Sequence, residues 1–392
     1  MKTEKLLSQP VKHLWLGFLL LTIFFSFYSW YSGRILLPLD TYGECLYPRT
    51  PNVSTAETAK NLWDKGTLER KEFYALRDYF VKQSSVERTL GFRPDVFSVA
   101  LDGRLLPKHP WLMSVLAAPF YGLFGQAGFW IFEQLALAGL FWGLYKMVQP
   151  YAGARSAAIL CSLVAVGTNL LYFYSYDFSY DVLGAALIIG GTALLRTHFF
   201  WAGLLLGASL HIRITNGVLI PFIIFAHYPF FLIKKCDWRP WLVTTAGVFL
   251  AWGPLLFINH HYFGDALRGP YARVIEMIQG QMVFDLTSHG LSWKYLTSEW
   301  QPRLLSILKT NPVFSLAPIG WLLCYRHKSK IYALTIASGG FLHLLVHLNY
   351  SYWIGSSGER FVIASILFML LPLVFIIQRS RESNCETHTG TL

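Results

Sequence analysis

The sequence predicts an all-α polytopic membrane protein, and three observations support this prediction. Apolar residues make up 54% of the 392-residue chain and charged residues only 14%, whereas soluble chains carry about 25% charged residues. The apolar residues form long runs such as 14–30 and 361–377, and a hydrocarbon core of about 30 Å requires runs of this length. The runs do not alternate in polarity, as the strands of a membrane barrel would.

Composition also excludes other classes of protein. An aromatic content of 17% is too high for a disordered chain. The net charge is +11 (33 − 22), but the basic residues are scattered between apolar runs, so we expect no nucleic-acid partner. The five cysteines are odd in number and form no CxxC motif. They therefore predict neither a disulfide framework nor a zinc site.

We expect about ten transmembrane helices in a single bundle, 1–378, followed by a short cytoplasmic tail, 379–392. The first extracytoplasmic loop, 34–125, is long and carries interfacial helices, and a second long loop covers 259–311. The segment 110–125 is apolar but short and contains Pro110, Pro119 and Gly122, which favours an interfacial or re-entrant piece. The expected spans are 14–33, 127–147, 156–175, 181–196, 199–214, 216–233, 240–258, 312–325, 331–349 and 361–378.

The distribution of charge predicts the orientation of these spans. With the N-terminus in the cytoplasm, every short basic loop lies on the inner side, as the positive-inside rule requires. Counting 110–125 as a full span would place half of these loops outside. The sequence therefore predicts a plasma (inner) membrane protein whose long loops, and whose active site, face away from the cytoplasm. The inner cations are Lys146, Arg155, Arg196, Lys234, Lys235, Arg239, Arg326, Lys328, Lys330, Arg379 and Arg381.

Asp40 is the first candidate for chemistry because it directly follows the first expected span. Lipid-facing neighbours can desolvate such a carboxylate and raise its pKa toward the range of a general base. The alternative is an ordinary interfacial aspartate that ends the helix. Glu44 is a weaker candidate of the same type.

Three cations at the outer ends of expected spans are candidates for binding an anion. Lys108 lies in a proline-flanked turn, Arg213 ends an apolar run, and Arg360 adjoins Glu359 in a glycine-rich turn. Arginine suits bidentate phosphate binding, and the N–H groups of a glycine-rich turn also bind anions. The alternative for Lys108 and Arg213 is snorkelling toward water.

Acids, histidines and tyrosines gather at the same outer junctions. Asp177 and Asp181 are four residues apart among tyrosines, so they can share a helical face, and charge at this depth is expensive and usually functional. His260 and Tyr271 belong to a segment that mixes acid, base and aromatic residues. His343 and His347 could bind a metal, but with no HExxH motif we expect a hydrogen-bonded pair within the bundle.

Together these segments resemble the GT-C superfamily of integral-membrane glycosyltransferases. The likeness extends to the branch with the bacterial lipid A aminoarabinose transferase, protein O-mannosyltransferases and RgtA/B/C/D-like sugar transferases. The residues that carry it are Asp40, the 58–66 segment, Lys108-His-Pro110 with 118–125, Gly203–Gly207 with Arg213–Asn216, Asn259 with 263–267 and Tyr271, and Trp353, Gly355, Gly358, Arg360, Phe361 and Pro372.

The resemblance implies an inverting transfer of a sugar from a polyprenyl-phosphate donor to an extracytoplasmic glycan, lipid or protein. The acid after the first span would be the catalytic base, and an interfacial helix would lie at the 108–110 segment. In many members Asp and Glu are adjacent at that place, and a related group places its acid nearer the position of Glu57. Asp40, Glu44 and Glu57 therefore all remain candidates for the base.

Lys108, Arg213 and Arg360 would then bind the donor phosphate. The sugar or the acceptor would contact Glu44, Asp177, Asp181, His260, Tyr271 and Glu359. No cofactor is required by this mechanism, and a divalent metal is left open. The main alternative is a membrane transporter or flippase of lipid-linked or small solutes. Transporters place ionisable residues near the bilayer midplane and contain repeats, whereas here these residues gather at the outer ends and no repeat is visible.

Overall fold

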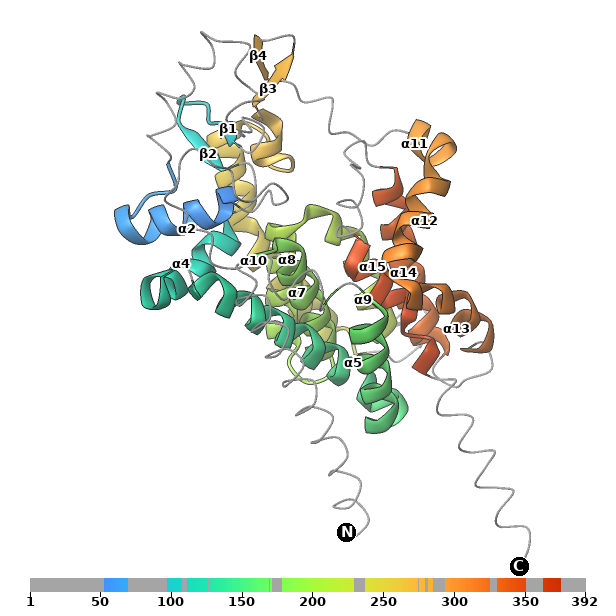
Figure 1. The fold of residues 1–392 in the computed structure, drawn as a ribbon. Helices are drawn as coiled ribbons and strands as arrows, with labels where there is room; N and C mark the ends of the chain where they lie inside the picture. The colour runs from blue at the N-terminus through green and yellow to red at the C-terminus, as the bar shows by residue number, and fades with distance from the viewer. Residues whose placement is uncertain are drawn as a thin grey trace, which may run out of the picture.

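The computed structural model is mostly helical, with two short β-hairpins at one end of the helices (Figure 1). The first expected span, 14–33, and the tail, 379–392, lie outside the residues that it describes. The described residues are 53–69, 97–107, 111–125, 127–168, 170, 178–228, 237–273, 275–278, 281–284, 293–324, 330–349 and 362–374.

α5 (Ala127–Gly167) is a helical hairpin rather than one rod. Gly153 has φ 78° and ψ 165°, which breaks the helix three residues after Pro150. The Cys161 thiol lies 3.8 Å from the carbonyl oxygen of Phe141, although 20 residues of straight helix would separate them by about 30 Å. The chain therefore folds back on itself, as expected for the two spans 127–147 and 156–175.

The next helices are α7 (Tyr180–Leu194), α8 (Phe199–Ile212), α9 (Leu219–His227) and α10 (Arg239–Phe263). The one-turn helix η2 (Ile214–Val218) connects α8 to α9. α8 and α10 pack backbone to backbone. A Cβ added at Gly203 would lie only 2.1 Å from the backbone carbonyl oxygen of Thr244. A Cβ added at Gly207 would lie 2.4 Å from the backbone carbonyl oxygen of Val248. Small residues allow this close approach between membrane helices.

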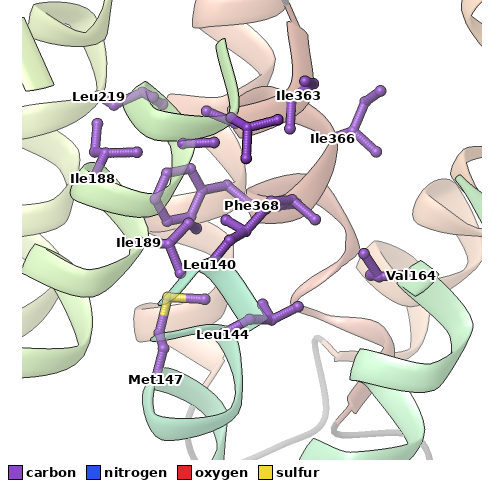
Figure 2. Packing of buried hydrophobic residues seen from close by; sticks show 14 of the residues in the cluster. Leu140, Leu144, Met147, Val164, Ile188, Ile189, Leu219, Ile363, Ile366 and Phe368 are labelled. Atoms are coloured by element: carbon purple, nitrogen blue, oxygen red, sulfur yellow. The ribbon is translucent and has the colours of Figure 1, made fainter. Parts of the chain in front are cut away.

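The C-terminal part begins with α11 (Trp293–Ser298) and α12 (Trp300–Thr310). η4 (Pro312–Leu316) and α13 (Ala317–Cys324) follow α12 after a bend of 109°. α14 (Lys330–Leu348) and α15 (Ile363–Leu370) complete it. Figure 2 shows Phe368 of α15 packed with Leu140 of α5 and Ile189 of α7 in the buried apolar core. The C-terminal helices therefore share one core with the central ones.

Three described helices are long and apolar enough to cross a membrane: α5, α10 and α14. The bent pair α12–α13 raises this number to four. The described part of each expected span from 127 onward contains helix, but α7 and α8 have 15 and 14 residues, or about 20 Å at 1.5 Å per residue. The chain is thus membrane-associated by helix length and composition, and ten spans remain a prediction.

The two expected outer loops contact each other. β1 (Phe97–Val99) pairs antiparallel with β2 (Leu105–Pro107), and β3 (Ile275–Ile278) pairs with β4 (Gln281–Phe284). The Ser98 hydroxyl donates to the Pro270 carbonyl at 2.7 Å, and Nε of Arg273 donates to the Val99 carbonyl at 2.7 Å. Segments that share hydrogen bonds lie on the same side of a membrane. That this side is extracytoplasmic remains a prediction.

α2 (Val53–Lys65) and α4 (Leu112–Phe124) pack together beside this end of the bundle (Figure 1). The Ser114 hydroxyl of α4 donates to the Thr55 carbonyl of α2 at 3.0 Å. With 13 residues, α4 extends about 20 Å, which is shorter than a hydrocarbon core. Its length fits the interfacial or re-entrant piece expected at 110–125.

Candidate functional site

A buried ion pair between Arg213 and Asp181 lies at the centre of the candidate site. Arg213 caps the C-terminus of α8 in an extended conformation (φ −145°, ψ 113°), and Asp181 lies in the first turn of α7. Nε and Nη2 of Arg213 both contact Oδ1 of Asp181. The side chains are only 16% and 2% exposed. Two residues singled out in the sequence, 32 positions apart, thus bind each other.

Tyrosines flank this guanidinium. The ring centroid of Tyr180 lies 4.8 Å from Cζ of Arg213, a cation–π arrangement that is strengthened when water is excluded. Tyr271 lies in η3 (Gly269–Arg273) and interacts electrostatically with Arg213. Of the residues predicted for the site, the structure therefore brings Arg213, Asp181 and Tyr271 together.

Asn259 fixes the turn that leads to Tyr271. This asparagine is 4% exposed near the end of α10, and its Nδ2 donates to the Ala266 carbonyl at 3.0 Å. Gly269 has φ +53°, and a Cβ there would lie 2.5 Å from the Asn259 side chain. Only glycine combines this backbone conformation with this close contact. The Asn259–Gly269 contact thereby sets the start of η3.

A histidine pair from α14 contacts the turn that follows Arg213. Nδ1 of His343 lies 2.6 Å from the Ser365 hydroxyl, and its Nε2 lies 3.3 Å from Nε2 of His347. Nε2 of His347 also lies 3.1 Å from the hydroxyl of Thr215 in η2. The expected hydrogen-bonded pair is confirmed, and it links α15 to the turn that follows Arg213. Among the described residues, no three His, Cys, Asp or Glu side chains are grouped to hold a metal.

Two buried charged residues at this end were not predicted from the sequence. Glu133 of α5 is 1% exposed and its Oε2 accepts the backbone N–H of Ser179 at 3.2 Å. Arg303 of α12 is 3% exposed and its Nη1 donates to the Leu348 carbonyl at 2.8 Å. A lone acid inside the apolar run 127–147 was a usable signal, because such charges are costly. Nothing in the sequence distinguishes Arg303 from a solvated cation.

Of the remaining candidates, His260 and Glu57 are described and the others lie outside the described residues. His260 is exposed on α10, and in the described part of the chain no contact joins it to Arg213. Glu57 falls within α2. The candidates that lie outside the described residues are Asp40, Glu44, Lys108, Asp177, Glu359 and Arg360.

Comparison with known proteins gives one distant likeness. The chain is similar to the apo crystal structure of the oligosaccharyltransferase of Archaeoglobus fulgidus, with 11% sequence identity and a TM-score of 0.48. The match covers 90% of this chain and 53% of that one, so the chain spans about half the length of the archaeal protein. No protein-family model and no curated protein matches the chain.

The arrangement suits recognition of an anion at the end of a helical bundle. A permanently charged guanidinium, paired with a carboxylate and close to the ring of Tyr180, is largely shielded from water, and electrostatic interactions are stronger there than in water. Asp181 holds the guanidinium in one orientation, which reduces reorganisation when a ligand arrives. Tyr271 interacts electrostatically with the same guanidinium.

Proposed function

We propose that the chain is a membrane glycosyltransferase that moves a sugar from a polyprenyl-phosphate donor to a glycan, lipid or protein acceptor outside the cytoplasm. The observation that carries this proposal is the buried Arg213–Asp181 pair, with the ring of Tyr180 against the guanidinium and Tyr271 in electrostatic interaction with it. A lipid-linked donor places its phosphate at the rim of the bilayer. A fixed, desolvated cation at the same level stabilises the charge that develops on the leaving phosphate.

The chemistry is an inverting displacement. An acceptor hydroxyl attacks the anomeric carbon and gives its proton to Asp40, while the bond from that carbon to the phosphate oxygen breaks. The electron pair of the broken bond leaves with the lipid phosphate, next to Arg213. A positioned general base contributes roughly 10²–10⁴-fold in rate. Glu44 and Glu57 are the alternative bases, and Lys108 and Arg360 are further cations for the phosphate.

The donor and acceptor sugars require hydroxyl-binding groups and stacking surfaces. Tyr271 and Tyr180 supply both next to Arg213, whereas Asp181 acts mainly by orienting the guanidinium. His260, Asp177, Glu44 and Glu359 are proposed to contact sugar or acceptor. The mechanism needs no cofactor, and it is compatible with a divalent metal that screens the phosphate.

The test is complementation of a strain that lacks the gene, followed by mass spectrometry of its membrane lipids and surface glycans. Loss of the protein should remove one glycan modification and cause a polyprenyl-phosphate sugar to accumulate. Asp40→Asn and Arg213→Ala should fail to restore the modification although they insert normally, whereas Arg196→Ala at the opposite end should restore it. Full restoration by Asp40→Asn would remove this residue from the mechanism.

A transporter of lipid-linked or small solutes is the second candidate, favoured by the 109° bend between α12 and α13. Transporters build their sites from broken helices. The bend begins at Asn311, however, whereas the buried ion pair joins α7 and α8. Proteoliposomes distinguish the two functions: a transporter moves its substrate intact, whereas the transferase breaks the bond between sugar and phosphate.

A further inference from the structure

Glu133 is a charged residue at a buried position of an apolar helix. It lies six residues into α5, one of the membrane-length helices, and is 1% exposed. Placing a carboxylate in apolar surroundings is expensive unless hydrogen bonds or opposite charges compensate it. A leucine would fill this position of an apolar helix at lower cost, so the carboxylate requires a specific explanation.

The explanation begins with the contact between Glu133 and the start of α7. Oε2 of Glu133 accepts the backbone N–H of Ser179, the N-cap residue of that helix, at 3.2 Å. The first N–H groups of a helix lack partners within the helix, and the positive end of its dipole favours an anion there. Glu133 therefore binds the N-terminus of α7 in the way that suits a carboxylate best.

Aromatic contacts fix the same segment to α5. The ring of Phe178 lies 4.9 Å from that of Phe129 and 6.0 Å from that of Phe132, centroid to centroid. Phe129, Phe132 and Glu133 are all in the first two turns of α5. The chain thus enters α7 with Phe178 held by two rings and the next N–H held by the carboxylate.

From Ser179 the contacts lead directly to the candidate site. The Ser179 hydroxyl accepts the backbone N–H of Asp181 at 3.2 Å, and both residues are buried. The Asp181 carboxylate in turn pairs with Arg213. A shift of the first turn of α7 would move Asp181 and, with it, the guanidinium.

We propose that Glu133 is a positioning residue, which anchors the first turn of α7 to α5 and thereby orients the Asp181–Arg213 pair for the donor phosphate. It contacts no substrate itself. The last step rests on the proposed function, whereas the structural coupling from Glu133 to Arg213 does not. A misplacement of about 1 Å at a reacting centre can cost roughly a hundredfold in rate, so a distant anchor can control activity.

The coupling is tested without substrate by a double-mutant cycle on the full chain in detergent. The thermal midpoint is measured for Glu133→Leu, Arg213→Leu and the double variant. If the anchor acts through Asp181, the double variant should lose less stability than the sum of the single losses. Strict additivity would overturn the proposal. If Glu133→Leu fails to insert, Ser179→Ala takes its place in the cycle. This variant removes the hydroxyl that accepts the backbone N–H of Asp181.

A matched control comes from the other end of the same helix. Thr192 of α7 is fully buried, and its hydroxyl donates to the Ile188 carbonyl within the helix. Thr192→Val should combine additively with Arg213→Leu, because it removes a buried hydroxyl without loosening the first turn. Non-additivity of the same size in this control would show a general effect of weakening α7 and would overturn the specific role of Glu133.

The second measurement uses the lipid-phosphate transfer itself. Glu133→Leu should lower kcat by roughly tenfold or more, with a smaller change in the KM of the donor, because orientation matters most as the phosphate leaves. Glu133→Gln keeps an oxygen that accepts the Ser179 N–H, and it should retain activity within about threefold. A Gln variant as inactive as the Leu variant would overturn positioning by this hydrogen bond. Absence of any transfer by the wild type would refute the proposed function and leave the cycle above intact.

Discussion

The two ends of the helical bundle both carry arginine and tyrosine but hold them differently. At one end Arg196, in the turn between α7 and α8, is exposed and lies 5.0 Å from the ring centroid of Tyr151. Tyr151 in turn stacks on Tyr332, centroid to centroid 3.9 Å. At the other end Arg213 is nearly buried, and its guanidinium is paired with a carboxylate that is buried more deeply.

The two arginines therefore differ in what compensates their charge. Water can solvate Arg196, whereas Arg213 depends on a paired carboxylate. An exposed arginine at the end that the sequence predicts to be cytoplasmic satisfies the positive-inside rule wherever it lies in the loop, and water solvates its charge. A buried arginine depends on one carboxylate in one geometry, because removing either group leaves an uncompensated charge. We therefore expect the loss of stability caused by a substitution to differ several-fold between the two ends.

The largest effect should come from Arg213→Leu, compared with Arg196→Leu. Loss of Arg213 leaves the Asp181 carboxylate buried without its cation, which should lower the free energy of unfolding by about 3 kcal/mol. Loss of Arg196 removes an exposed cation–π contact worth about 0.5–1 kcal/mol. Denaturant titration of the two variants in the same detergent measures both values.

A double variant sharpens this comparison. Asp181→Leu combined with Arg213→Leu removes both charges, so it should be more stable than either single variant, as for other buried pairs replaced by apolar residues. A double variant less stable than both singles would show that the pair is not the dominant interaction of these side chains. Transfer activity should be lost in all three variants.

An intermediate effect is expected for single hydrogen bonds at the two ends. Ser365→Ala removes the partner of His343 Nδ1 in a fully buried position, which should cost about 1–3 kcal/mol. Tyr228→Phe removes a hydrogen bond to the Leu195 carbonyl at the end that carries Arg196, where the tyrosine is only partly buried, and should cost about 1 kcal/mol. Equal thermal midpoints for the two variants would contradict the distinction between the ends.

Sequence patterns predicted the residues of the site better than their partners. Arg213 and Asp181 were found because charge beside apolar runs is rare, and the histidine pair because i and i+4 share a helix face. That Arg213 pairs with Asp181 depends on how α7 packs against α8, which no local pattern records. Glu133 carries the same signal as Asp181, a charge beside apolar residues, but it lies within an apolar run and not at a junction between runs.

Helix lengths were the weaker part of the prediction for a physical reason. Composition shows which segments of the chain are apolar. The ends of the helices depend on where Gly, Pro and Asn occur within those segments. Asn216-Gly217 lies in the turn between α8 and α9, and Asn311-Pro312 lies at the 109° bend. The described parts of the apolar runs from 127 onward are therefore helical, whereas the described helices within several of them are shorter than a bilayer.

The smallest effect concerns an exposed ion pair at the same end as the site, Asp102 with Arg104. Nε of Arg104 donates to Oδ2 of Asp102 at 2.8 Å, and the side chains of Arg104 and Asp102 are 40% and 46% exposed. This hydrogen bond lowers the pKa of Asp102 below its ordinary value of 3.8. The pair therefore stabilises the fold fully above that value, and the contribution disappears as the pH falls through the lowered pKa.

Because water screens the pair, Asp102→Asn should cost under about 1 kcal/mol at pH 7, and the difference in stability from wild type should narrow toward pH 3. Thermal midpoints of wild type and variant at both pH values measure this. A loss as large as that of Arg213→Leu, or one that persists unchanged at pH 3, would mean that burial is not what separates strong from weak ion pairs in this molecule.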